Sequence, residues 1–277
     1  MIITNYGSSG TGKSTFSASL AMAIEKANPR ATVLIINFNT DVPMHAIWNT
    51  KKDIPRNYSL GYLFEGEKIE QKDIAKFIVT LENNKNVGLL GYCLGDSPLS
   101  YKDIEYKKVL QLLKAAEQLV DYVIVDCGSN LLKDETAASI EMANCLNMFL
   151  LPDPNGVVYK KTSALMYENN PKFIVANTNY IIGPSRNFNA VKDMRNALNI
   201  KAYDLPYSTD IAVKNCEGDI FGAYKVSPRR YKSIIKKILE STGNAKFVAD
   251  AKKDEAEQQA LEQKKNKQNK QNKQNNA

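Results

Sequence analysis

The chain has 277 residues, of which 43% are hydrophobic and 24% are charged, a composition that excludes a mainly disordered or fibrous protein. Its formal net charge of +7 permits an acidic partner such as nucleic acid or anionic lipid without requiring one. No apolar run approaches the roughly 18 residues that cross a bilayer. Residues 1–6 also lack the basic start of a signal peptide. We therefore expect a soluble, cytoplasmic protein with no membrane span.

The cysteine and histidine content argues against a disulfide framework and against metal sites built from histidines or paired cysteines. The single histidine, His45, excludes a multi-histidine metal site. The four cysteines are far apart and lack the paired spacing of a disulfide framework or a zinc site. We expect all of them to be buried thiols: Cys93, Cys127, Cys145 and Cys216.

Short apolar runs rich in β-branched residues alternate with helical stretches along the chain. Strands are expected at residues 2–6, 32–38, 87–93, 122–126, 146–151, 173–177 and 202–205. Helices are expected at residues 14–27, 103–119, 136–143, 157–167, 210–216 and 229–239. This alternation is typical of an α/β fold in which a mainly parallel sheet carries helices on both faces.

The end of the chain differs in composition from the rest. From residue 263 onward it contains only Lys, Asn, Gln and a final Ala, with no apolar side chain to anchor it. We expect a folded domain over residues 1–243 and a polar tail over residues 244–277 that is disordered or a frayed helix.

The strongest motif lies between the first expected strand and the first expected helix. Residues 7–14 read GSSGTGKS and satisfy the phosphate-loop pattern G-x-x-x-x-G-K-[ST]. In such a loop backbone N–H groups cradle phosphate oxygens, Lys13 reaches the β- and γ-phosphates, and Ser14 binds Mg²⁺. A Gly/Ser-rich turn that binds nothing is disfavoured, because strand, motif and helix occur in the required order. The expected nucleotide-binding residues are Ser9, Gly10, Thr11, Gly12, Lys13, Ser14 and Thr15.

An acidic residue is expected to complete the site formed by the loop. Asp126 follows the apolar run 122–125, where a carboxylate at the end of a neighbouring strand would help to hold Mg²⁺. Taken alone, an aspartate after a strand is more often a turn or cap residue, so this assignment depends on the phosphate loop.

These motifs resemble those of the MinD/ParA family of P-loop ATPases, which includes the pilus-assembly relatives CpaE and TadZ. Residues 10–15 match the deviant Walker A loop of that family, residues 33–41 match switch I and residues 121–128 match switch II. The resemblance implies ATP and Mg²⁺ as ligands and a nucleotide-dependent homodimer. It also implies that Asn177 recognises the adenine edge and that Pro206 lines the base pocket. Without it, we would assign these two residues to a strand-end turn and a loop kink.

The sequence departs from the family pattern at three positions. Ser8 stands where the family has a signature lysine that reaches the partner's phosphates. Asn37 and Asn39 stand where switch I has two aspartates, and an asparagine can orient water but cannot accept its proton. We therefore expect a weak ATPase at most, with Lys13, Asn39 and Asp41 as the catalytic candidates.

A basic stretch lies near the end of the expected domain. Between residues 220 and 239 there is no acidic side chain. ParA-like proteins bind DNA nonspecifically through C-terminal basic helices, so nonspecific DNA is a candidate partner. A solvated helix face remains the alternative. The residues concerned are Arg229, Arg230, Lys232 and Lys236.

Three functions are consistent with these observations. The first is an ATP-dependent dimerisation switch that positions or partitions DNA, a pilus or a conjugation machine. The second is a nucleotide-bound scaffold that recruits partners with little hydrolysis, as Ser8, Asn37 and Asn39 suggest. A small-molecule kinase is less favoured, because the sequence shows no arginine-rich lid insertion.

Overall fold

The computed structural model describes residues 1–40, 43, 48, 54–97, 99–101, 104–168, 178–186 and 188–243. The chain divides into two compact units, residues 1–235 and residues 236–277, and in the second unit the structure describes residues 236–243. The expected domain boundary near residue 243 therefore stays a prediction. Within these described ranges, every helix is too short or too polar to cross a membrane.

The first unit is built on an eight-stranded sheet with the order β3-β4-β2-β5-β1-β6-β7-β8. Neighbouring strands are parallel except at the edge, where β3 pairs with β4 in the antiparallel sense. The sheet confirms the expected α/β fold. Its strands are β1 (Ile2–Gly7), β2 (Val33–Asn37), β3 (Val79–Thr80), β4 (Val87–Leu90), β5 (Tyr122–Asp126), β6 (Cys145–Leu150), β7 (Thr178–Ser185) and β8 (Ala202–Pro206).

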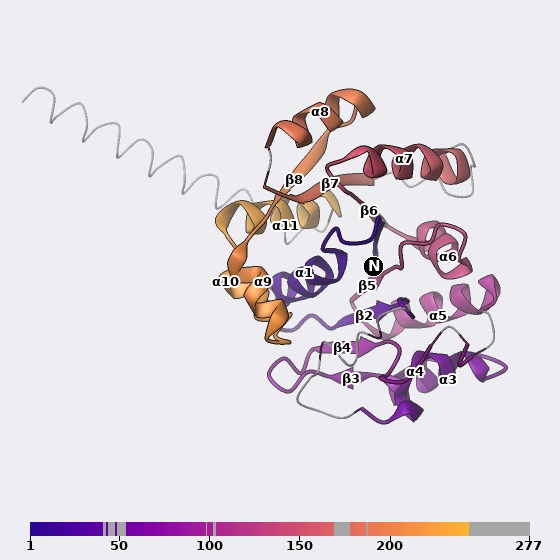
Figure 1. Cartoon of the computed structure of the whole chain (residues 1–277). Coiled ribbons are helices and arrows are strands. Elements are labelled where there is room, and N and C mark those ends of the chain that lie inside the picture. Colours follow the sequence, from indigo (N-terminus) through magenta and orange to yellow (C-terminus); the bar gives the residue numbers. More distant parts are fainter. Residues whose placement is uncertain are drawn as a thin grey trace, which may run out of the picture. The chain divides into compact units, whose positions relative to one another are not determined.

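Helices cover both faces of this sheet (Figure 1). One face carries α1 (Lys13–Ala27), α9 (Thr209–Cys216) and α10 (Ala223–Val226). The other carries α4 (Gln71–Phe77), α5 (Tyr106–Leu119), α6 (Asp134–Met142), α7 (Pro154–Ser163) and α8 (Phe188–Leu198). The remaining helical elements are a 3₁₀ turn (Arg56–Tyr58), α3 (Leu60–Glu65), a π-helical turn (Ala164–Glu168) and α11 (Arg229–Ser241).

Small side chains allow α1 to lie close to the sheet. Its residues 15–24 are all buried and include many alanines and serines. Phe16 packs against Phe149 of β6 and Tyr231 of α11, with ring centroids 5.2 Å and 5.8 Å away. The Tyr231 hydroxyl lies 3.5 Å from Ser19. The phosphate loop is thus attached to a helix that is fixed on two sides.

Several elements were not predicted from the sequence. The strand expected at residues 173–177 lies outside the described residues, and the strand beside β6 is β7, which was not predicted. Its segment Thr-Asn-Tyr-Ile-Ile-Gly-Pro-Ser contains strand-forming residues, but Asn and the Gly-Pro dipeptide weaken the strand pattern. Helices α3, α4, α8 and α10 were also not predicted. Cys216 is exposed rather than buried, whereas the other three cysteines are buried.

Candidate nucleotide-binding site

The expected site residues gather at one edge of the sheet. Strand β5 lies between β2 and β1, and all three are parallel, so their carboxyl ends meet at the same edge. The loops that follow them are tied together, because Phe38 N–H donates to the Asp126 carbonyl and Cys127 N–H donates to the Asn5 carbonyl. This edge is where open parallel sheets generally bind ligands.

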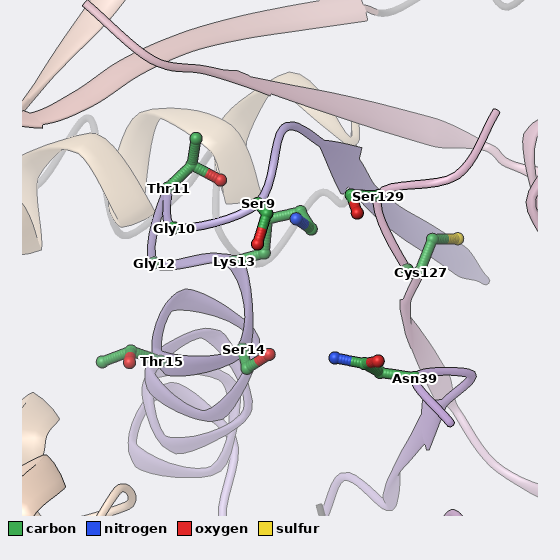
Figure 2. Close-up of a pocket in the computed structure, with 11 residues that line it drawn as sticks. Ser9, Gly10, Thr11, Gly12, Lys13, Ser14, Thr15, Asn39, Cys127 and Ser129 are labelled. Carbon is green, nitrogen blue, oxygen red and sulfur yellow. The ribbon is translucent and has the colours of Figure 1, made fainter. Parts of the chain in front are cut away.

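A cavity of about 280 Å³ lies at this edge (Figure 2). Ser14 on α1 and Asn39 after β2 point toward each other across it, while Cys127 and Ser129 form the wall after β5. The phosphate loop and the end of β2 both line this cavity. It is lined by Ser9, Gly10, Thr11, Gly12, Lys13, Ser14, Thr15, Asn39, Cys127, Gly128 and Ser129.

The loop conformation depends on glycine at its first position. Gly7 has φ +145°, and a Cβ there would lie 2.1 Å from the Phe149 carbonyl oxygen on β6. Ser8 N–H donates to the same oxygen at 3.0 Å, which fixes the loop against β6. Gly10 also has a positive φ, +73°, but open space surrounds its Cβ position.

We expect Gly7→Ala to lower the free energy of unfolding by at least about 3 kcal/mol, because it adds a backbone clash to a strained φ. Gly10→Ala is the matched control and should cost only about 1 kcal/mol, since it adds strain without a clash. Urea unfolding of both variants measures the difference. Equal losses in the two variants would contradict this account of the loop.

Lys13 is held over the loop that contains it. Its Nζ donates to the carbonyl oxygens of Gly7 at 3.0 Å and Ser8 at 2.8 Å. The side chain is buried, and burial lowers the pKa of Lys13, while the nearby Asp126 and Cys127 act in the opposite direction. Two backbone carbonyls therefore orient a partly desolvated cation beside the cavity.

Asp126 is a buried carboxylate with one oxygen still available. Its Oδ2 accepts a hydrogen bond of 2.7 Å from Asn37 Nδ2, whereas Oδ1 is buried and has no hydrogen-bond partner in the structure. Burial raises the pKa of Asp126, and the nearby polar side chains of Ser14, Asn37 and Ser17 together with the charge of Lys13 oppose that shift. An unused carboxylate oxygen beside the Ser14 hydroxyl provides the hard oxygen ligands that Mg²⁺ prefers. The residues present therefore fit Mg²⁺.

The structure shows how the asparagines that depart from the switch I pattern are held. Asn37 donates to Asp126, so an aspartate at that position would place two carboxylates within hydrogen-bonding distance. Asn37 also accepts a 3.1 Å hydrogen bond from Asn39 N–H, which fixes the turn after β2. Asn39 lines the cavity, whereas Asp41 lies outside the described residues. Ser8 is buried at the loop, and its Oγ has no hydrogen-bond partner in the structure.

The structure describes only one of the two residues that are expected to contact the nucleotide base. Asn177 lies outside the described residues. Pro206 ends β8 and pairs with Ser185 of β7, but it is not among the residues that line the cavity. Pro184 was not predicted to belong to the site, but its Cδ lies 3.8 Å from the position of a Cβ on Gly12. The Gly-Pro dipeptide before Ser185 is a signal of irregular backbone, and the pairing of β7 with β8 shifts register there.

An arginine and a tyrosine stack next to Pro184. Tyr207 N–H donates to the Ser185 carbonyl at 3.2 Å, and the Arg186 guanidinium lies 3.9 Å from the centroid of the Tyr207 ring. The ends of β7 and β8 are thereby joined by a cation–π pair. Their position after the carboxyl ends of these strands places the pair on the same edge of the sheet as the loop.

Part of the basic stretch is engaged within the first unit. Arg230 Nη2 lies 2.5 Å from Oδ2 of the buried Asp204. Lys232 Nζ donates to the Lys225 carbonyl at 3.0 Å and lies 5.6 Å from the Tyr224 ring centroid. Arg229 is exposed. On the same helix, Tyr231, Ile234 and Ile235 are buried.

The architecture of this chain is similar to that of known proteins. No family model matches the chain. A ParA family ATPase from Chlorobium tepidum superimposes with a TM-score of 0.70 over 86% of this chain and 98% of that protein, at 15% sequence identity. The chain has the ParA/MinD fold.

Two other structures with the ParA/MinD fold were solved with nucleotides. A plasmid partition protein from Borrelia burgdorferi bound to AMPPNP matches with a TM-score of 0.65 and 18% identity, over 86% of this chain and 97% of that one. The septum site-determining protein MinD of Pyrococcus horikoshii, complexed with Mg-ADP, matches with a TM-score of 0.62 and 17% identity, over 87% of this chain and 96% of that one.

A relative by sequence is an uncharacterized ATP-binding protein of Methanocaldococcus jannaschii. It is 27% identical over 154 residues, which cover 54% of this chain. The match spans about half of that relative, 52% of its length.

Proposed function

We propose that this chain binds ATP and Mg²⁺ at the cavity between the phosphate loop, Asn39 and the loop after β5. The observation that carries the proposal is the buried, unpartnered Oδ1 of Asp126 beside a complete phosphate loop. A buried charged oxygen without a partner is costly, and a cation bound at this point would remove that cost.

Each part of the loop has a distinct role in this proposal. The backbone N–H groups of residues 9–15 bind phosphate oxygens at the N-terminus of α1, where the helix dipole favours negative charge. Lys13 adds a positive charge and exchanges its carbonyl partners for phosphate oxygens. Ser14 and Asp126 hold Mg²⁺, which neutralises phosphate charge when it is bound.

The base would lie toward the ends of β7 and β8. Pro206 and Asn177 are the residues that the family resemblance assigns to it. The stacked pair Arg186 and Tyr207 offers planar surfaces at the same edge of the sheet, and aromatic and guanidinium planes stack well on bases. The solved structures with AMPPNP and Mg-ADP support a nucleotide and Mg²⁺ as ligands of this fold.

At the level of the whole protein, we propose a nucleotide-dependent homodimer that acts in positioning or partition, of DNA or of a surface or conjugation machine. Ser8 lacks the charge that the family's signature lysine brings to the partner's phosphates, so the dimer would depend on other contacts. Nonspecific DNA is a candidate partner of Arg229, Arg230, Lys232 and Lys236. Arg230 and Lys232 have partners within the protein, so binding to DNA phosphates would compete with those contacts.

The test is a titration of ATP with Mg²⁺, combined with light scattering to measure molecular mass. Binding together with a doubled mass supports the switch. Binding at constant mass rejects the dimer but retains the nucleotide site. Absence of binding rejects the proposal.

A scaffold with poor hydrolysis is the second candidate, favoured by Asn37 and Asn39. Asn37 is fixed by Asp126 and the turn, which leaves Asn39 as the side chain of this pair that lines the cavity. A small-molecule kinase has no comparable observation in its favour.

We expect Asn39→Asp to raise ATP turnover about tenfold or more, because a carboxylate at the cavity can accept the proton of the attacking water. Phosphate release measured at saturating ATP reports the change. Asn83→Asp, at the turn after β3, is the matched control and should leave turnover unchanged. An unaltered rate in Asn39→Asp would contradict the assignment of Asn39 and direct attention to Asp41.

A further inference from the structure

A row of polar side chains crosses the sheet at the level of Asp126. Asp126 of β5 is paired in register with Asn37 of β2 and with Asn5 of β1. On the other side of β1, Asn5 pairs with Asn147 of β6, and Asn147 pairs with Asn179 of β7. Directly paired residues of parallel strands lie on the same face of a sheet. We call Asn5, Asn147 and Asn179 the asparagine row.

The three amides of the asparagine row form a directed chain of hydrogen bonds. Asn179 Nδ2 donates to Asn147 Oδ1 at 3.0 Å, and Asn147 Nδ2 donates to Asn5 Oδ1 at 2.7 Å. Asn5 Nδ2 then donates to Ser17 Oγ on α1 at 2.8 Å. Asn147 and Asn5 therefore each accept from the strand on one side and donate in the direction of α1, and bonds aligned in this way strengthen one another.

Ser17 connects the asparagine row to the candidate site. Because its oxygen accepts from Asn5, the single hydroxyl proton of Ser17 must point elsewhere. Ser17 Oγ donates to the Lys13 carbonyl at 3.0 Å, and Ser17 is one of the polar side chains near the Asp126 carboxylate. The row thus determines the direction in which Ser17 donates, toward the first turn of α1.

Buried amides at this level need an explanation, because apolar side chains would be cheaper to bury. Asn5 and Asn147 are fully buried. Two residues earlier on the same face, Ile3 of β1 pairs with Ile124 of β5 and Cys145 of β6. This face of the sheet is therefore apolar two residues before the asparagine row and polar at the level of Asp126.

We infer that the asparagine row positions Ser17 and, through it, the first turn of α1, which carries Lys13 and Ser14, for the bound metal and nucleotide. The three asparagines are positioning residues, since none of them lines the cavity. This inference rests on the proposed function, because it assigns the row to the same ATP and Mg²⁺ site.

The test compares ATP affinity in Mg²⁺ with ATP affinity in EDTA, in the full-length chain. Asn147→Leu removes the central amide while keeping a similar volume. We expect it to weaken ATP binding in Mg²⁺ about tenfold, as for other residues that orient metal ligands. Its affinity in EDTA should stay within about twofold of the wild type, because the loop N–H groups and Lys13 remain.

Thr4→Val is the matched control. Thr4 precedes Asn5 on β1 and faces the opposite side of the sheet, where its buried hydroxyl donates to the Ser139 carbonyl at 2.9 Å. The control loses a buried hydrogen bond in the same strand and should not change the ratio of the two affinities. If Asn147→Leu does not fold, Asn179→Leu replaces it, because Asn179 is only partly buried and ends the row.

The outcomes are distinct. A loss confined to Mg²⁺ supports the inference. An equal loss in Mg²⁺ and EDTA, or no loss in either, overturns it and leaves the asparagine row as a structural feature. A wild-type chain that binds ATP equally well in both conditions overturns the inference but not nucleotide binding. A wild-type chain that binds no ATP in either condition rejects the proposed function, and the inference falls with it.

Discussion

Lys13→Ala is expected to weaken ATP binding by about 100-fold or more, because it removes the charged side chain at the cavity and charge-assisted hydrogen bonds contribute about 1.5–3 kcal/mol each. Lys13 lies at the cavity with its ammonium oriented by the Gly7 and Ser8 carbonyls. A fluorescent ATP analogue titrated in the presence of Mg²⁺ measures the loss.

Lys160→Ala is the matched control for this variant. Lys160 is also buried, but it belongs to α7 and its Nζ lies 5.2 Å from the Tyr180 ring centroid. ATP affinity should stay within about twofold of the wild type in this control, because its ammonium contributes nothing to the cavity. Unchanged affinity in Lys13→Ala would remove the basis for the nucleotide site, and an equal loss in both variants would indicate misfolding.

Asp126→Asn is expected to abolish the Mg²⁺-dependent part of ATP affinity, about a 10- to 100-fold effect. The amide keeps one oxygen and nearly the same volume, but it removes the charge that would attract the cation. Comparing ATP titrations in Mg²⁺ and EDTA isolates this contribution. Retained Mg²⁺ dependence in the variant would show that the metal is held elsewhere.

The same substitution should change how stability depends on pH. Burial raises the pKa of Asp126 in the folded protein above its ordinary value of 3.8. As the pH rises from 3.8 through this higher pKa, the carboxyl ionises first in the unfolded state, so the folded state becomes less stable relative to it. At pH values below 3.8 both folded and unfolded states are protonated and the cost is absent. The free energy of unfolding of Asp126→Asn, relative to that of the wild type, should therefore increase by about 1 kcal/mol or more between pH 4 and pH 7.

Urea unfolding of both proteins without nucleotide at these two pH values provides the measurement. Asp121→Asn is a useful reference, because backbone and side-chain hydrogen bonds from Thr32 lower the pKa of that carboxyl. Because the pKa of Asp121 is lowered from 3.8, this carboxyl is mostly ionised in both folded and unfolded states between pH 4 and pH 7. The stability difference between Asp121→Asn and wild type should therefore change little over that interval and shrink at lower pH. A parallel response of the two variants would contradict the opposite environments of these carboxylates.

Much of the fold and part of the site could be predicted from local sequence. The strand Ile2–Gly7, the glycine-containing loop and the helix Lys13–Ala27 follow from residues that lie next to each other in the chain. Apolar periodicity over α5 and α11 predicted those helices, because a buried stripe is encoded at fixed spacing. Strand β7 was missed because Asn and the Gly-Pro dipeptide interrupt its strand-forming residues, while pairing with β6 holds the segment in the sheet.

Local sequence was enough to predict the phosphate loop and the alternation of strands and helices, because each depends on short spacing. The place of Asp126 beside the loop depends instead on the pairing of β5 with β1. Tertiary structure alone decided that Pro184 lies against the loop, that Asp204 holds Arg230, and that three asparagines from separate strands form one hydrogen-bonded row. Those contacts depend on strand order and register, which are set by pairing between residues more than 25 positions apart. No local pattern of side chains records which strands become neighbours, and for that reason the positioning of Asp126 emerged only from the folded chain.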